Sequence, residues 1–237
     1  MTRVLGTLTL LLALSACGEG PVRPEGPERV PSASLVGEPE DTTASPGLEE
    51  VPPGYDESPD GAPAVADDEL ADAALTALLR TRASARASAT HCRADQVEVS
   101  LEGFDAALGH RFTTIVVRNT SARTCTLEGV PGFGVRGGWG STFVPEVQST
   151  DRGPNGKLIP ARPVRLAPGK TARSGLEWTG DLAGAQSEPA SLVVVQLASG
   201  QVPATTPARL ATDPVDAPPL DIGQFTTIYL APFETVR

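Results

Sequence analysis

From Gln96 to the C-terminus, the sequence is a series of short β-rich stretches separated by turn residues. Apolar and polar residues alternate in QVEVSLEGF, and FTTIVVRN is rich in β-branched side chains. Runs of this length, with no helical period between them, are typical of strands. Similar stretches follow: TCTLEG, STFVPEVQ, TARSGLEWT, SLVVVQLAS and QFTTIYLAPF. The pattern predicts an all-β fold, an immunoglobulin-like β-sandwich, over residues 91–237.

The first residues have the pattern of an export signal. Arg3 supplies positive charge, residues 4–14 are apolar, and Ser15 and Ala16 are small residues of the kind a signal peptidase requires. A transmembrane helix needs about 20 apolar residues, and this run ends at Cys17. Leu14-Ser15-Ala16-Cys17 resembles the bacterial lipobox, in which the cysteine is joined to diacylglycerol and becomes the first residue of the mature chain.

Residues 1–16 are therefore expected to be a lipoprotein signal peptide, and Cys17 the lipidated residue. The protein would be exported and anchored by lipid to the outer face of the cytoplasmic membrane, in the bacterial cell envelope. The alternative is an ordinary signal peptide cleaved near Ala16, followed by an incidental cysteine.

Residues 17–66 are expected to form a disordered, acidic, Pro-rich tether. The formal net charge of the chain is -10, and most of the excess acid lies in this region. Few aromatic residues are present, so the segment cannot bury enough apolar surface to offset its ordering entropy. A stalk or wall-crossing spacer and an unconstrained linker both fit this composition. The acids are Glu19, Glu25, Glu28, Glu38, Glu40, Asp41, Glu49, Glu50, Asp56, Glu57 and Asp60, and the bases are Arg23 and Arg29.

Residues 67–90 are expected to hold a short amphipathic helix and a linker. In DDELADAALTALLRTR, leucine and alanine recur at helical spacing, acids occupy the first turn, and Arg80 and Arg82 come at the end. This arrangement of charge matches the helix dipole. We expect the apolar stripe to dock on the domain that follows, and partner binding by the helix is the alternative.

Two cysteines, Cys92 and Cys125, remain once Cys17 is lipidated. An exported chain meets an oxidising environment, so we pair them in a disulfide bond. Two reactive thiols or a metal site are the alternatives. Zinc usually takes four ligands, and His91 and His110 do not complete a recognisable spacing with these cysteines. No metal and no cofactor are expected.

The cysteines belong to a longer set of motifs. Cys92 precedes a predicted strand, and FTTIVVRNTSARTCTLEGVPGFGV and RLAPGKTARSGLEWT follow. Together they resemble the domain of unknown function found in secreted proteins and lipoproteins of high-GC Gram-positive bacteria. The resemblance covers most of residues 91–200. It implies an immunoglobulin-like, envelope-facing domain with no established activity.

The sequence departs from the family pattern at two places. Val130 stands where the family often has tyrosine, and no further cysteine lies near Ser187, where many members have one. The second departure favours the pairing of Cys92 with Cys125.

Two glycine-containing stretches match phosphate-binding motifs in part. Residues 132–137 read G-x-G-x-x-G, but a dinucleotide site needs a helix directly after the loop, and GWGSTFVPEV does not predict one. These glycines are expected to let a strand bend or bulge. Pro168 would remove an amide from a phosphate loop, so residues 167–170 are expected to form a hairpin turn.

Phe133, Trp139 and Phe143 cluster around this glycine-rich segment. We expect these aromatic residues to fill the core. Their alternative role is a contact patch on an exposed loop at one end of the sandwich.

The function that fits these features best is a lipid-anchored cell-envelope protein, a non-catalytic binding or structural module. The expected partners are the membrane, through the lipid, and an envelope protein or glycan. Acids and bases nearly balance from His91 onward, so no nucleic acid is expected. No catalytic residues are predicted, because a nucleophile needs an adjacent base and neither histidine lies in a recognisable motif. An envelope hydrolase that uses a carboxylate pair or a metal is the alternative.

Overall fold

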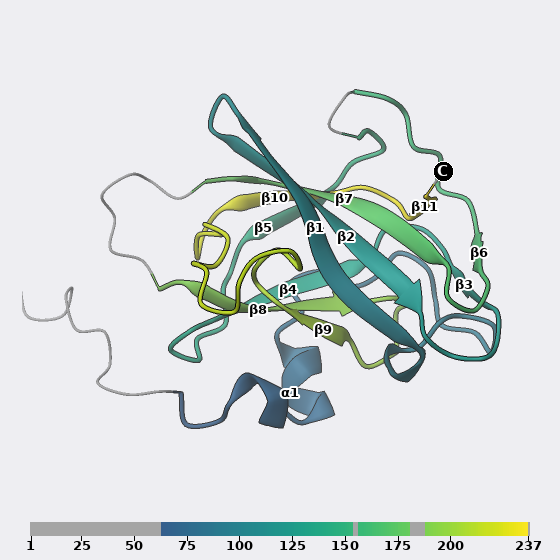
Figure 1. Cartoon of the computed structure of the whole chain (residues 1–237), viewed down its shortest axis with the longest axis horizontal. Helices are drawn as coiled ribbons and strands as arrows, with labels where there is room; N and C mark the ends of the chain where they lie inside the picture. The colour runs from purple at the N-terminus through teal and green to yellow at the C-terminus, as the bar shows by residue number, and fades with distance from the viewer. Residues whose placement is uncertain (1–62, 154–155, 181–187, 237) are drawn as a thin grey trace, which may run out of the picture. The chain divides into compact units, whose positions relative to one another are not determined.

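The computed structural model describes residues 63–153, 156–180 and 188–236. The predicted signal peptide, Cys17 and nearly all of the predicted tether lie outside these residues. The described part is built of strands, with one short α-helix (Figure 1). No helix within it is long and apolar enough to cross a membrane. The strands are β1 (Val97–Ala107), β2 (His110–Asn119), β3 (Cys125–Leu127), β4 (Gly132–Gly137), β5 (Glu146–Ser149), β6 (Val164–Leu166), β7 (Thr171–Thr179), β8 (Ala190–Gln196), β9 (Ala204–Pro207), β10 (Thr227–Leu230) and β11 (Glu234–Thr235).

The strands form two layers, as the predicted β-sandwich requires. The long sheet has the order β1-β2-β7-β10-β5, and β11 pairs with the start of β7. The short sheet has the order β4-β8-β9, and β3 pairs with β6 beside it. Neighbours are antiparallel except β10 and β5, which run parallel. The all-β prediction is confirmed.

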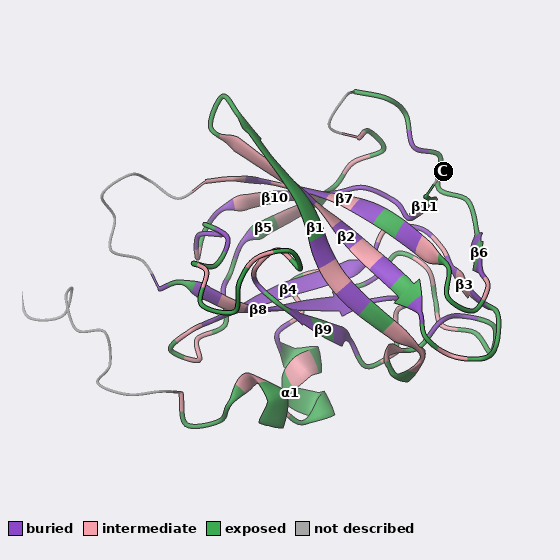
Figure 2. Ribbon diagram, in the orientation of Figure 1, coloured by how far each residue is buried: buried purple, intermediate pink, exposed green. Residues whose placement is uncertain are grey.

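The main core lies between the layers, and buried residues alternate with more exposed ones along several strands (Figure 2). In β7, Ala172, Ser174, Leu176 and Trp178 are buried, while the residues between them are more exposed. The indole Nε1 of Trp178 donates hydrogen bonds to the backbone oxygen and Oδ1 of Asp221, both at 3.2 Å. The largest core side chain is therefore hydrogen-bonded as well as packed.

The predicted N-terminal helix is shorter than expected. A 3₁₀ turn (η1, Asp67–Glu69) precedes an α-helix (α1) that covers Asp72–Ala77, so the prediction of a helix over residues 67–82 is wrong at both ends. After Leu78 the chain becomes extended, because Arg80 and Thr81 donate their backbone N–H groups to the Phe133 carbonyl at 2.8 and 3.2 Å. Pairing with β4 outweighs the local helical preference of this segment.

The apolar stripe of this segment docks on the short sheet, as predicted. Leu70, Leu75, Leu78 and Leu79 pack around Leu192 and Val194 of β8, while Val193 and Val195 face the main core. Successive residues of a strand point to opposite faces, and residues 192–195 of β8 are all apolar because both faces are covered. We call residues 65–83 the strap.

Two glycines of β4 let the strap lie directly against the strand. A Cβ at Gly134 would overlap the carbonyl oxygen of Leu78, and one at Gly132 would lie 2.6 Å from the backbone nitrogen of Ala83. The expected irregularity is also present, as a register shift between Arg136 and Gly137. The spacing that resembles a dinucleotide motif therefore serves a close approach between backbone segments.

Replacing Gly134 by alanine is expected to lower the free energy of unfolding by about 1–3 kcal/mol, because the new methyl group overlaps rigid backbone. Gly138→Ala is the matched control, since its Cβ would meet Pro189 at an ordinary 3.5 Å. Urea denaturation of the two variants measures the difference. Equal stability of the two would contradict the close approach of the strap.

Candidate functional site

The predicted disulfide bond between Cys92 and Cys125 is present, and both residues are buried. Cys92 also donates its backbone N–H to the Thr126 carbonyl at 3.0 Å, and Thr126 donates to the Thr90 carbonyl at 2.9 Å. The bridge therefore fixes the chain just before η2 (Ala94–Gln96) to β3. Two buried, bonded sulfurs have a structural role here, and the alternatives of free thiols or a thiolate metal site are excluded.

The three aromatic residues named as an alternative contact patch are not together on the surface. Phe133 and Phe143 are completely buried in the main core, so the contact-patch alternative is wrong for both and the core interpretation is confirmed. Trp139 is 38% exposed, in the turn that follows β4, so the core prediction is wrong for this residue. Phe133 is on the strand face opposite its glycine neighbours, which explains its burial.

The turn that carries Trp139 is held by a buried carboxylate. Glu188 accepts hydrogen bonds from the backbone N–H of Trp139 at 2.6 Å and from the N–H and hydroxyl groups of Ser141. A Cβ at Gly137 would overlap this carboxylate. Glu188 is 7% exposed, and these donors satisfy its buried side-chain oxygens. Its role is to fix the turn.

A buried arginine, Arg136, lies on β4, the strand that precedes this turn. Arg136 is 5% exposed, and its guanidinium donates hydrogen bonds to Oδ1 of Asp67 and, at 2.8 Å, to the backbone oxygen of Val65. Burial of an unpaired cation is costly, so removal of Asp67 would leave Arg136 in an unfavourable state. The ion pair fixes the beginning of the strap to β4.

A network of hydrogen bonds surrounds the side chain of Asn119 at the end of β2. It is completely buried, and its amide donates hydrogen bonds to the carbonyls of Arg123 and Leu166 at 2.7 and 2.8 Å. Its Oδ1 accepts from the N–H and hydroxyl groups of Ser121 at 3.0 and 2.8 Å. Asn119 therefore joins the end of β2, the turn before β3 and the end of β6.

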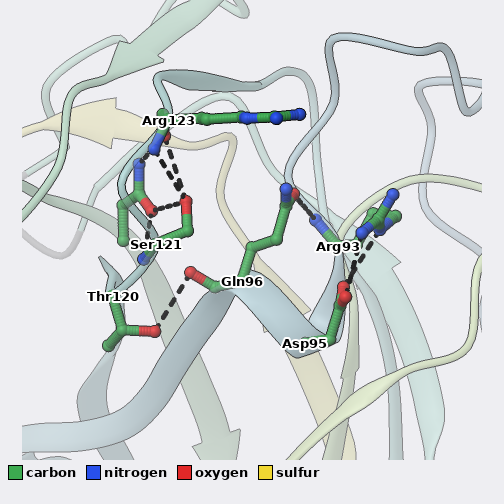
Figure 3. A network of polar contacts seen from close by, with 7 residues as sticks. Arg93, Asp95, Gln96, Thr120, Ser121 and Arg123 are labelled. Carbon is green, nitrogen blue, oxygen red and sulfur yellow. Dashed lines mark hydrogen bonds and ion pairs between the residues drawn. The ribbon is translucent and has the colours of Figure 1, made fainter.

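Figure 3 shows the surface side of this network, where the hydroxyl of Thr120 donates to the backbone oxygen of Gln96 at 3.2 Å. Nearby, Arg93 and Asp95 form an exposed pair of hydrogen bonds at 2.9 and 3.0 Å. The hydrogen bond with Arg93 lowers the pKa of the Asp95 carboxyl, and the same bond raises the pKa of Arg93. Such exposed pairs add little to stability.

Both histidines lie beside carboxylates. The Nδ1 atom of His91 is 2.8 Å from the hydroxyl of Ser88, and its Nε2 atom is 3.8 Å from Glu128. The backbone N–H of His91 also donates to the Ser88 carbonyl at 3.2 Å, so the hydroxyl contact closes a turn. In the same way, Nδ1 of His110 is 2.8 Å from Oε1 of Glu177 on the neighbouring strand. We interpret the contacts of His91 with Glu128 and of His110 with Glu177 as structural.

No group of three or more histidine, cysteine, aspartate or glutamate residues in the described part of the chain is placed to hold a metal ion.

Hollows with the dimensions of ligand sites lie in two regions of the described surface. One, of about 430 Å³, lies between α1 and the first residues of β1, with Leu75, Val97 and Val202 in its lining. The other, of about 310 Å³, lies between residues 157–164 and the C-terminal strand β11. Its lining includes Lys157, Arg162 and Arg173. The near balance of acids and bases over residues 91–237 conceals this second hollow, which could not be predicted from the overall charge.

Comparison with protein families confirms the resemblance drawn from the motifs. Residues 92–226 match the family described as a domain of unknown function, DUF4232. Comparisons with curated proteins and with solved structures give no match. The matched region begins at the disulfide cysteine and ends just before β10, so the strap lies outside it. The chain belongs to the DUF4232 family.

Proposed function

We propose that this protein is a lipid-anchored module of the cell envelope, which presents its sandwich to a binding partner and catalyses no reaction. The observation that carries the proposal is the attachment of the strap. The strap follows the predicted tether, and its first residues are fixed to the sandwich by the ion pair of Asp67 with the buried Arg136. Tension on a tether at this point would act on the folded domain and not on a loose terminus.

The anchor in this proposal is the lipidated Cys17. Each buried acyl CH₂ group contributes about 0.8 kcal/mol, so the two or three chains of a bacterial lipoprotein hold a protein stably at a membrane. The acidic residues of the tether would repel an anionic leaflet and favour an extended position of the domain.

The use of the buried polar side chains supports a non-catalytic role. Asn119, Arg136 and Glu188 each bind backbone groups or the strap, and these contacts hold turns and chain segments together. Hydrolysis of an envelope substrate by the purified full chain, lost on replacement of one exposed carboxylate, would instead favour the alternative of an envelope hydrolase.

Replacing Cys17 by alanine is expected to move the full chain from the membrane fraction to the soluble fraction, because the acyl chains can no longer be attached. Cell fractionation and immunoblotting measure the distribution. Ser15→Ala is the matched control, since it keeps a small residue before the cysteine and should stay with the membrane. Retention of the Cys17→Ala variant in the membrane fraction would contradict the anchor.

A further inference from the structure

One stretch of this acidic protein is strongly basic. The formal net charge of the chain is -10, yet residues 152–176 contain no acid. Glu177 is the next acidic residue. The bases in this stretch are Arg152, Lys157, Arg162, Arg165, Lys170 and Arg173.

Three of these bases line the 310 Å³ pocket named above, which we call the basic pocket. Residues 157–164 form one wall, residues 233–235 form the opposite wall, and Arg173 of β7 also lines it. In Figure 1, the labels of β6 and β11 mark this end of the sandwich. Segments from two parts of the sequence, residues 157–164 and β7, therefore bring positive charge to one place.

The base of the pocket is apolar. Ile159, Val164 and Phe233 line it and are only 7%, 5% and 1% exposed. A ligand that enters would meet charged groups at the rim and apolar side chains beneath them. Sites for small molecules commonly combine these two features.

The walls are held in place by the backbone. Ile159 donates its N–H to the Asp151 carbonyl at 2.7 Å, and Phe233 donates to the Gly129 carbonyl at 2.9 Å. Pro160 and Pro163 restrict the wall further, because each fixes its own φ angle. A site of fixed shape loses less conformational entropy when a ligand binds.

The lining carries excess positive charge. The one acidic side chain among the lining residues, Glu234, accepts a hydrogen bond from Nε of Arg173 at 2.9 Å. The lining side chains, three bases and one carboxylate, therefore carry a formal charge of +2. Arg173 and Glu234 are 47% and 35% exposed, so their pairing is weak and the guanidinium can also meet a ligand.

We propose that the basic pocket binds the phosphate group of a phosphate monoester that carries a small apolar body. A phosphate monoester has a charge of about −1.5 to −2 at neutral pH, which matches the lining, whereas one carboxylate supplies a single negative charge. Arginine is favoured for phosphate because its planar fork can donate two parallel hydrogen bonds. The apolar base accommodates the body of the ester. This inference rests on the proposed binding role and names the ligand class for it.

The phosphate could belong to a free ester or to a phosphate-bearing polymer. Arg165 and Lys170 are exposed in the same basic stretch, on β6 and in the turn that follows it. A polymer with repeated phosphates would contact them as well as the pocket, while a free ester would not reach them.

Isothermal titration calorimetry on the full chain, purified in a nonionic detergent, tests the inference with phenyl phosphate as the probe. Phenyl phosphate is expected to bind, and benzoate, with one negative charge, is expected to bind at least about tenfold more weakly. Arg162→Gln should weaken phenyl phosphate binding about tenfold, because one charge-assisted hydrogen bond is lost. Arg162 is exposed, so the substitution should leave the fold intact.

Arg111→Gln is the matched control. Arg111 is an arginine outside the basic pocket: it lies opposite Trp178, near the end of the long sheet away from Arg173, and pairs with Asp221 through Nε at 3.0 Å. Its replacement removes the same charge and should change the affinity less than about twofold. No binding of phenyl phosphate at millimolar concentration, or equal losses in the two variants, would overturn the proposal.

A second titration with a short polyphosphate separates the two sources. Tighter binding than that of phenyl phosphate, weakened by Arg165→Gln, would identify a polymer as the ligand. Equal affinity, unaffected by that variant, would identify a free ester. The titrations need no membrane, so their failure is distinct from retention of the Cys17→Ala variant in the membrane fraction, which would refute the anchor alone.

Discussion

Replacing Asn119 by aspartate is expected to lower the free energy of unfolding by about 3–5 kcal/mol. The side chain is completely buried, and its amide donates to two carbonyl oxygens, those of Arg123 and Leu166. An aspartate has nearly the same size but replaces both N–H donors with a carboxylate oxygen. Two carbonyls would then lose their partners, and a buried negative charge would face them.

Urea denaturation followed by tryptophan fluorescence measures this effect, since Trp178 is in the core. Ser121→Ala provides a graded comparison, because it removes the hydroxyl that donates to Oδ1 of Asn119 and should cost about 0.5–1.5 kcal/mol. A stability of the Asn119→Asp variant within about 0.5 kcal/mol of the wild type would refute the central place of this amide in the fold.

Reduction of the bridge between Cys92 and Cys125 is expected to cost roughly 3–4 kcal/mol. The two cysteines are separated by 33 positions in the sequence, and the bond removes the entropy of closing that loop from the unfolded chain. It also keeps Cys92, which follows the strap in the sequence, beside β3. The expected loss is a large fraction of the stability of an ordinary domain.

Denaturation curves with and without a reducing agent measure this loss, with mass spectrometry to confirm that the bridge is open. The same comparison in the Cys17→Ala variant is the control, because it excludes any contribution of the third cysteine. An unchanged midpoint in a chain that is shown to be reduced would contradict the stabilising role of the bond.

Much of the fold could be predicted from the sequence, because the strands that form the long sheet have clear patterns. The stretches QVEVSLEGF, FTTIVVRN and TARSGLEWT correspond to β1, β2 and β7. β4 was expected only as a bend or bulge in a strand, because GFGVRG contains three glycines, and glycine is unfavourable in strands. Its glycines fit the strand because the strap covers them. That contact joins segments about 50 residues apart, which local patterns do not reveal.

The helix shows the opposite error. The spacing of leucines in residues 67–82 predicts a helix, and six residues of it are helical. The rest is extended because its backbone N–H groups pair with the Phe133 carbonyl. Docking of the leucines was nevertheless predicted correctly, since a stripe of apolar side chains is stabilised by burial whether the segment is helical or extended.

The functional residues were harder to predict than the fold. Asn119 could be recognised as part of a family motif, but its role depends on Leu166, which lies far away in the sequence. The basic pocket did have a signal in the sequence, the run of residues 152–176 without an acid. The participation of Arg173 and Phe233 in one lining depends on the pairing of β11 with β7.

The display of this sandwich from a lipid anchor is tested most directly by mass spectrometry of the N-terminal peptide of the mature protein, extracted from the membrane fraction of its own cells. We expect a mature chain that begins at Cys17 and carries diacylglycerol on the cysteine sulfur. A mature chain that begins at another residue, or a Cys17 without lipid, would contradict it.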